Sequence, residues 1–305
     1  MPVATAKSDP TRVNLALPPP DRYAVLGQPV AHSQSPFIHA EFARQTGQRL
    51  TYGRLECPLQ GFEASLRAYI ATADPAVGLG PVRGCNSTVP FKFQELPLAE
   101  SVTPRAALAQ AANVLSFEPA GWTADNTDGI GLVRDIQGPS GGLLAGQRVL
   151  LIGAGGAAAG VLGPLIEAGC ADITVANRSA DKAIALVERH QDWAHHHGAR
   201  LRASGLADCG EAFDVVLNSS ASSLAGGAVP VPARVLRPGT LAVDLMYGPA
   251  AAGFLAWAAA HGAVGRDGLG MLVEQAAEAF ALWRGVRPHT AAVLAALRAR
   301  LATKT

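Results

Sequence analysis

The sequence lacks the cysteine patterns that cross-link small domains or hold metal ions. Its four cysteines are widely spaced, contain no CxxC pair and fit neither a disulfide framework nor a zinc site. Isolated cysteines of this kind are typical of a reducing compartment. We therefore expect a cytoplasmic protein without disulfides.

The sequence also lacks an excess of either charge. The formal net charge of its 305 residues is +1, whereas proteins that bind nucleic acid or anionic membranes usually carry a basic patch. Residues 1–20 contain no apolar stretch of the signal-peptide type and predict a flexible N-terminal extension. The uncharged run 149–166 contains five glycines and a proline, which favours a strand, a glycine turn and a buried helix over a membrane span. We expect no nucleic-acid or membrane partner.

What the sequence does contain is an alternation of strand and helix patterns, typical of an α/β fold with helical crossovers. A first unit begins with the apolar strand "RYAVLG". A helix over "SPFIHAEFARQT" follows, with Ser35 predicted as N-cap and Gly47 as its end. Further strands are predicted over "LTYGRLEC" and "VRGCNSTV", and a short helix from Pro90. A second unit begins near "TDGIGLVRDI", and two helical stretches over 270–284 and 290–303 follow its last strand.

The second unit carries a glycine turn typical of dinucleotide-binding proteins. The string "GAGGAA" follows a Val/Leu/Ile-rich strand and precedes a helix, the context in which a GxGxxG-like motif binds pyrophosphate. The next strand ends in "ANRSADK". Arg178 stands where an NAD site usually carries an acid, and a guanidinium pairs well with a 2′-phosphate. The cofactor we expect is NADP. The plain alternatives are a structural glycine turn and an arginine that points to water.

Taken together, these motifs resemble the shikimate dehydrogenase family. The resemblance rests on "AVLGQPVAHSQSPFIHAEFA", "NSTVPFK", "DNTDG", "LIGAGGAA", "NRS" and "DGLGMLVEQAAEAF", in that order along residues 21–300. It implies reversible, NADPH-dependent reduction of 3-dehydroshikimate to shikimate, a step in the formation of chorismate and the aromatic amino acids.

The resemblance also implies two domains with a cleft between them. An N-terminal α/β substrate domain, residues 21–127, would be completed by C-terminal helices over 269–305. A Rossmann-like NADP-binding domain, residues 128–268, would be inserted between these two parts. Glycines 129 and 131 would allow a hinge. The oligomeric state is left open between monomer and homodimer.

By position, the resemblance implies roles for individual residues. Lys92 and Asp128 would be the catalytic pair. Substrate would be bound by Ser33, Ser35 and Tyr247 at its carboxylate and by Thr88, Asn113, Asp128 and Gln275 at its ring hydroxyls. The cofactor would be bound by Gly153, Ala154, Gly155, Gly156, Ala157, Asn177, Arg178, Ser179, Lys182, Leu245 and Gly268.

Without the resemblance, several of these residues have simpler interpretations. Lys92 alone would be a solvated lysine, Asp128 a first-turn carboxylate that favours the helix dipole, and Ser33 and Ser35 a turn and a cap. The adjacent histidines 195–197 predict a solvated loop, and we expect no metal site.

Two letters depart from the family pattern. Ser87 stands in "NSTVPFK" where valine is common, and Val114 follows Asn113 where threonine is common. On a strand, Ser87 should face away from Thr88. Both departures leave the substrate preference open. A quinate/shikimate dehydrogenase of relaxed substrate or cofactor choice therefore remains an alternative, as does a non-catalytic NADPH-binding regulatory protein.

Overall fold

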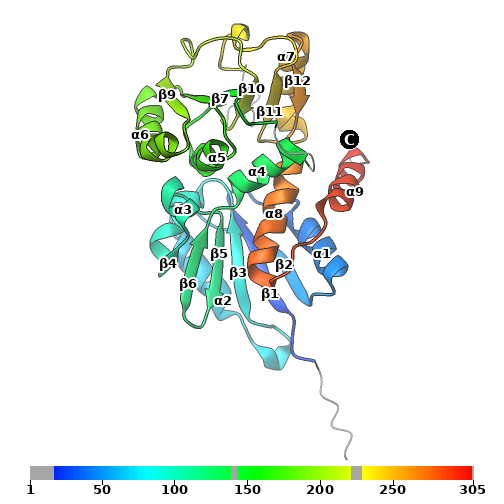
Figure 1. Ribbon diagram of the computed structural model, residues 1–305. Coiled ribbons are helices and arrows are strands. Elements are labelled where there is room, and N and C mark those ends of the chain that lie inside the picture. The colour runs from blue at the N-terminus through cyan, green and yellow to red at the C-terminus, as the bar shows by residue number, and fades with distance from the viewer. Residues whose placement is uncertain (1–16, 139–142, 221–228, 304–305) are drawn as a thin grey trace, which may run out of the picture.

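The computed structural model describes residues 17–138, 143–220 and 229–303, so residues 1–16 of the predicted N-terminal extension lie outside the described residues. The described chain forms two six-stranded sheets, each covered by helices. Helix α4 (Asp128–Gln137) lies between the two halves of the molecule and packs against helices of both (Figure 1). The predicted α/β class is confirmed.

The first sheet is mixed and has the strand order β2-β1-β3-β5-β6-β4. Strands β1, β2 and β3 are parallel, whereas β5 is antiparallel to both β3 and β6. Its strands are β1 (Asp21–Gly27), β2 (Leu50–Glu56), β3 (Val82–Ser87), β4 (Ser101–Val102), β5 (Val114–Glu118) and β6 (Gly121–Asp125).

Helices cover both faces of this sheet. Aromatic and aliphatic side chains of α1, α8 and α9 form one core cluster, and residues of α2 and the strands form another. The C-terminal helices pack back onto the first unit, where α8 contacts β3 and α1, and α9 lies beside α1 (Figure 1). These helices are α1 (Ser35–Thr46), α2 (Phe62–Ala71), α3 (Pro104–Ala109), α8 (Leu269–Arg284) and α9 (Thr290–Ala302).

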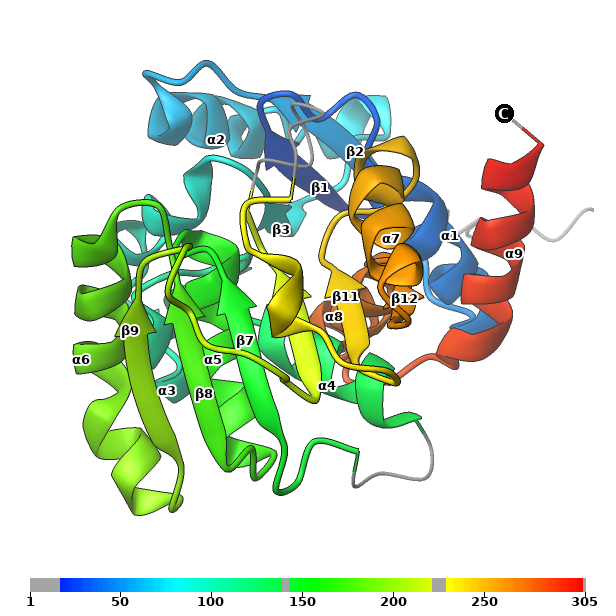
Figure 2. The same cartoon turned by 90° about the horizontal axis from the view of Figure 1, so that it is seen from above.

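The second sheet is parallel throughout and has the order β12-β11-β10-β7-β8-β9. Counted from its first strand, this is the doubly wound order 3-2-1-4-5-6, in which ligands bind where the winding reverses, between β7 and β10. Figure 2 looks onto this half, with α6 at its edge. Its elements are β7 (Arg148–Ile152), α5 (Gly156–Glu167), β8 (Asp172–Ala176), α6 (Ala180–His196), β9 (Arg200–Ser204), β10 (Val215–Asn218), β11 (Leu241–Asp244), α7 (Pro249–Ala260) and β12 (Val264–Arg266).

Three local predictions need correction. Ser35 is the first residue of α1 and not its cap, because the helix begins one residue earlier than predicted, with Gln34 as the N-cap. The short helix after Pro90 is a single 3₁₀ turn (Phe91–Phe93). The histidines 195–197 do not form a loop, because α6 continues through His196 and His197 caps it.

In the part of the chain that the structure describes, no helix is long and apolar enough to cross a membrane. Within the same residues, no group of three His, Cys, Asp or Glu side chains lies in a position to hold a metal ion.

Candidate active site between the two sheets

The candidate site is assembled at one edge of the first sheet. Strands β3 and β6 run in the same direction, so the segments that follow them emerge at the same edge. Strand β5 runs the opposite way, so the residue that precedes it, Asn113, lies at that edge too. The topology thus brings Lys92, Asn113 and Asp128 together.

Lys92 and Asp128 form a largely buried ion pair. The ammonium Nζ of Lys92 donates to Oδ2 of Asp128, and the two side chains are 14% and 6% exposed. The backbone of Lys92 is held in place, because its carbonyl accepts a hydrogen bond from the N–H of Ala112 at 2.8 Å. The N–H of Asp128, at the start of α4, donates to Oδ1 of Asn126. The solvated-lysine alternative does not describe this residue.

The buried side-chain amide of Asn113 joins the Lys92–Asp128 pair to helix α8. Nδ2 of Asn113 lies 2.9 Å from Oδ1 of Asp128, 3.0 Å from Oγ1 of Thr127 and 3.1 Å from Oε1 of Gln275. Asn113 and Gln275 are 2% and 8% exposed. The amides and the carboxylate are held in one network, which fixes their positions relative to one another.

Thr88 and Ser87 have different neighbours. The methyl of Thr88 faces Gly27 so closely that a Cβ there would lie 2.5 Å from it. Ser87 is 4% exposed and lies beside the buried carboxyl of Glu95.

The N-terminus of α1 gathers a second polar group. Oγ of Ser33 donates to Oγ of Ser35 at 3.2 Å, and the guanidinium of Arg54 donates to the carbonyl of Ser33 at 2.6 Å. Burial raises the pKa of Tyr247, and the backbone of Gln34 and the charge of Arg54 act against this rise. The tyrosine therefore stands beside these serines although it lies more than 200 residues away in the sequence.

The glycine turn meets the first unit at Lys92. Gly153 has φ +112°, a conformation that favours glycine, and α5 begins at Gly156, one residue after Gly155. A Cβ on Gly156 would lie 3.1 Å from Cβ of Lys92, whereas nothing lies within 4 Å of such an atom on Gly155. The turn is open toward solvent and ends next to the ion pair. Ala154 and Ala157 are half-buried beside it.

The segment after β8 presents two cations to solvent. Arg178, Ser179 and Lys182 are exposed, and neither basic side chain has a partner among the described residues. Nδ2 of Asn177 donates to the carbonyl of Ser179 and shapes the turn into α6. On the other side of the winding reversal, the N–H of Gly268 donates to the carbonyl of Met246, and a Cβ on Gly268 would lie 2.3 Å from the carbonyl oxygen of Leu245.

Glycines 129 and 131, predicted to allow a hinge, allow close helix packing. Both lie within α4. A Cβ on Gly129 would lie 2.4 Å from the carbonyl oxygen of Gly160, and one on Gly131 would lie 2.6 Å from Cβ of Gln275. Small residues let α4 approach α5 on one side and α8 on the other.

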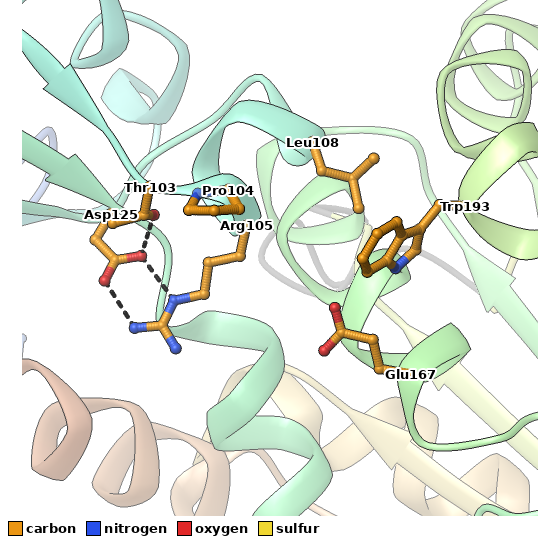
Figure 3. Close-up of a pocket in the computed structure, with 7 residues that line it drawn as sticks. All are labelled: Thr103, Pro104, Arg105, Leu108, Asp125, Glu167 and Trp193. Carbon is orange, nitrogen blue, oxygen red and sulfur yellow. Dashed lines mark hydrogen bonds and ion pairs between the residues drawn. The ribbon is translucent and has the colours of Figure 1, made fainter. Parts of the chain in front are cut away.

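A separate cavity of about 630 Å³ opens between α3 and α6 (Figure 3). The guanidinium of Arg105 on its wall is already bound by Asp125, with two contacts of 2.7 Å, and by Glu278. No predicted site residue lines it; its walls comprise Thr103, Pro104, Arg105, Leu108, Asp125, Glu167 and Trp193. The cavity lies apart from the candidate site.

Sequence reasoning missed several residues that hold the site together. Thr127 links Asn113 to Gln275, and Asn126 anchors Asp128; both lie in "DNTDG", where the clustered polar letters were a usable signal. Arg54 and Glu95 carried no such signal, because an arginine on an edge strand and a glutamate near a helical turn are usually solvated.

A parallel doubly wound sheet and a mixed sheet meet at a buried lysine–aspartate pair, and this arrangement defines the chain as a two-sheet α/β protein with a glycine turn of the dinucleotide-binding type. Three family models match it: the shikimate dehydrogenase substrate binding domain over residues 25–115, the shikimate/quinate 5-dehydrogenase over 138–225, and the shikimate 5′-dehydrogenase C-terminal domain over 268–298. The chain belongs to the shikimate dehydrogenase family.

Individual relatives agree with this assignment. The chain is 65% identical over 279 residues to the shikimate dehydrogenase (NADP(+)) of Methylibium petroleiphilum, covering 92% of this chain and 94% of that one. Among solved structures, an Ael1 enzyme from Pseudomonas putida is 44% identical with a TM-score of 0.78, over 91% of this chain and 98% of that one. A shikimate 5-dehydrogenase from Thermus thermophilus in complex with NADP(H) and shikimate is 31% identical with a TM-score of 0.77, over 92% and 99%.

Proposed function

We propose that this protein catalyses the reversible reduction of 3-dehydroshikimate to shikimate with NADPH. The observation that carries the proposal is the buried Lys92–Asp128 pair, which lies next to the first residue of a helix that follows a dinucleotide-type glycine turn. The names of the relatives, which include NADP(+), support the same activity.

The residues present fit NADP as the cofactor. The open N-terminus of α5 offers backbone N–H groups and a favourable dipole for a pyrophosphate. Arg178 and Lys182 are exposed cations without partners among the described residues, placed after β8 where a 2′-phosphate would be recognised. Leu245 and Gly268, across the winding reversal, are proposed to border the nicotinamide.

The bound cofactor supplies a hydride to the ketone of the substrate. As the ketone is reduced, negative charge develops on its oxygen and must be met by a proton donor. The ammonium of Lys92 is proposed to meet this charge, with Asp128 orienting it and sharing the proton. The pair takes the proton back in the reverse direction.

The remaining polar residues are proposed to orient the ring. Ser33, Ser35 and Tyr247, gathered at the N-terminus of α1, would bind the carboxylate, which a helix N-terminus favours. Thr88, Asn113 and Gln275 would bind the ring hydroxyls, with Asp128. We propose that residues 21–127 and 269–305 form the substrate domain and that 128–268 form the cofactor domain.

The test is the reduction of NADP by purified protein on addition of shikimate, followed at the nicotinamide absorbance. Replacing Lys92 by alanine should lower kcat and leave shikimate binding largely intact. Gln94→Ala, an exposed neighbour in the same turn, is the matched control. Full turnover by the Lys92→Ala enzyme would remove Lys92 from the mechanism.

A second candidate is a dehydrogenase that also accepts quinate, which the description of one matching family model as a shikimate/quinate 5-dehydrogenase supports. Comparing kcat/KM for shikimate and quinate, each with NADP and NAD, separates the two. A third candidate, a regulatory protein that binds NADPH, would show intact cofactor binding and no turnover with either acid.

A further inference from the structure

A carboxyl group is buried next to the catalytic pair without any partner of its own. Glu95 is 0% exposed, and neither of its carboxyl oxygens has a hydrogen-bond partner among the described residues. The Ser87 hydroxyl beside it is also buried and does not reach hydrogen-bonding geometry with it or with another described residue. An ionised carboxylate in such a place would be very costly.

Glu95 follows Lys92 by three residues, just after the 3₁₀ turn that carries it. Burial raises the pKa of Glu95 from 4.5 to about 8. The positive charge of Lys92 acts against this rise, and the negative charge of Asp128 adds to it. The carboxyl group is therefore coupled to both members of the catalytic pair.

The other titratable groups that face Glu95 carry no charge near neutral pH. Burial, together with the charge of Glu95, raises the pKa of Cys85 on β3 well above its ordinary value. The pKa of Tyr52 on β2 is raised in the same way, chiefly by burial. The charges that face Glu95 are thus Lys92 from its own turn and Asp128 from α4.

We propose that Glu95 is a positioning residue for Lys92. The uncharged acid keeps Asp128 as the carboxylate that holds the ammonium, and ionisation of Glu95 adds a second negative charge near that ammonium. The inference rests on the proposed role of Lys92. The neutral acid leaves the ion pair undisturbed, whereas the ionised acid adds a second carboxylate beside one ammonium. The added negative charge makes the ammonium hold its proton more tightly, so turnover falls.

The kinetic test compares wild-type protein with Glu95→Gln, which preserves the shape of the neutral acid. The ratio of kcat for Glu95→Gln to kcat for wild type should be constant below pH 7 and rise about ten-fold by pH 9, one unit above the ionisation. Taking the ratio cancels ionisations that both proteins share. KM for shikimate should be unchanged, and Glu118→Gln, an exposed glutamate on β5, should show a flat ratio. A flat ratio for Glu95→Gln overturns the proposal.

A spectroscopic test does not depend on turnover. In protein with ¹³C-labelled glutamate carboxyl groups, one resonance should titrate with a midpoint near pH 8 and be absent in Glu95→Gln. In Lys92→Ala the midpoint should move higher, because the charge that lowers it is gone. A midpoint near 4.5, or one that Lys92→Ala leaves unchanged, overturns the proposal. If Glu95→Gln does not fold, the wild-type and Lys92→Ala spectra still decide.

The two proposals fail in different ways. If Lys92→Ala turns over normally, the proposed mechanism fails whatever Glu95 does. If Lys92→Ala is inactive but the kcat ratio for Glu95→Gln is flat, only the positioning role of Glu95 fails.

Discussion

Replacing Glu95 by glutamine should stabilise the folded protein, and more so as the pH rises. The carboxyl group has a pKa of 4.5 when exposed and about 8 in the fold. Between these two values the folded state binds a proton that the unfolded state has released. Stability therefore falls as the pH rises through this window, the opposite of the usual effect of a carboxylate.

The size of this loss of stability follows from the difference between the two pKa values of Glu95. Each pH unit between the two pKa values costs about 1.4 kcal/mol. From 4.5 to pH 7 the loss is about 3 kcal/mol, and above pH 8 it levels off near about 5 kcal/mol. Glutamine is isosteric with the protonated acid and does not ionise, so Glu95→Gln should recover these amounts.

The assay is urea denaturation followed by circular dichroism at pH 5, 7 and 9. The free energy of unfolding of Glu95→Gln should exceed that of wild type slightly at pH 5 and by about 3 kcal/mol at pH 7. Glu118→Gln, at an exposed position, should differ little at any pH. An equal gain at pH 5 and pH 7, or a loss at pH 7, would refute the reasoning, because burial of the ionisable group would then not be the cause.

Three further outcomes are expected. Lys92→Ala should lower kcat about 10²- to 10⁴-fold in the steady-state assay, with Gln94→Ala near wild type. A rise in KM with kcat unchanged would show that Lys92 contributes only to substrate binding. Arg178→Ala should raise KM for NADP about ten-fold or more, by loss of a charge-assisted contact, and leave KM for NAD unchanged; equal effects on both cofactors would contradict a 2′-phosphate role. Gly131→Ala should destabilise the fold by about 1–3 kcal/mol, since its Cβ would lie 2.6 Å from Cβ of Gln275. An unchanged free energy of unfolding in urea would show that α4 and α8 can move apart at no cost.

The structure explains why some local predictions were wrong. Local hydrogen bonds lie at the start of α1 and at the end of α6: the N–H of Ser35 donates to the Ser33 hydroxyl, and the N–H of His197 donates to the carbonyls of Trp193 and Ala194. Sequence patterns do not fix such bonds at element ends. The hairpin β5–β6 and the short helix α3 were not predicted.

The sequence by itself determined those features that depend only on residues close together in the chain. The glycine turn between a buried strand and a helix, the basic letters after the next strand and the class of fold follow from local pattern. The order of the motifs was enough to identify the family resemblance.

The tertiary structure alone decided which residues meet. Because β5 runs antiparallel between β3 and β6, Asn113 comes to the same edge as Lys92 and Asp128. Helix α8 returns from the end of the chain and brings Gln275 into contact with Asn113. Burial of Glu95 beside this pair is likewise a property of packing. A carboxyl group's pKa depends on the water and charges around it, and the fold determines both.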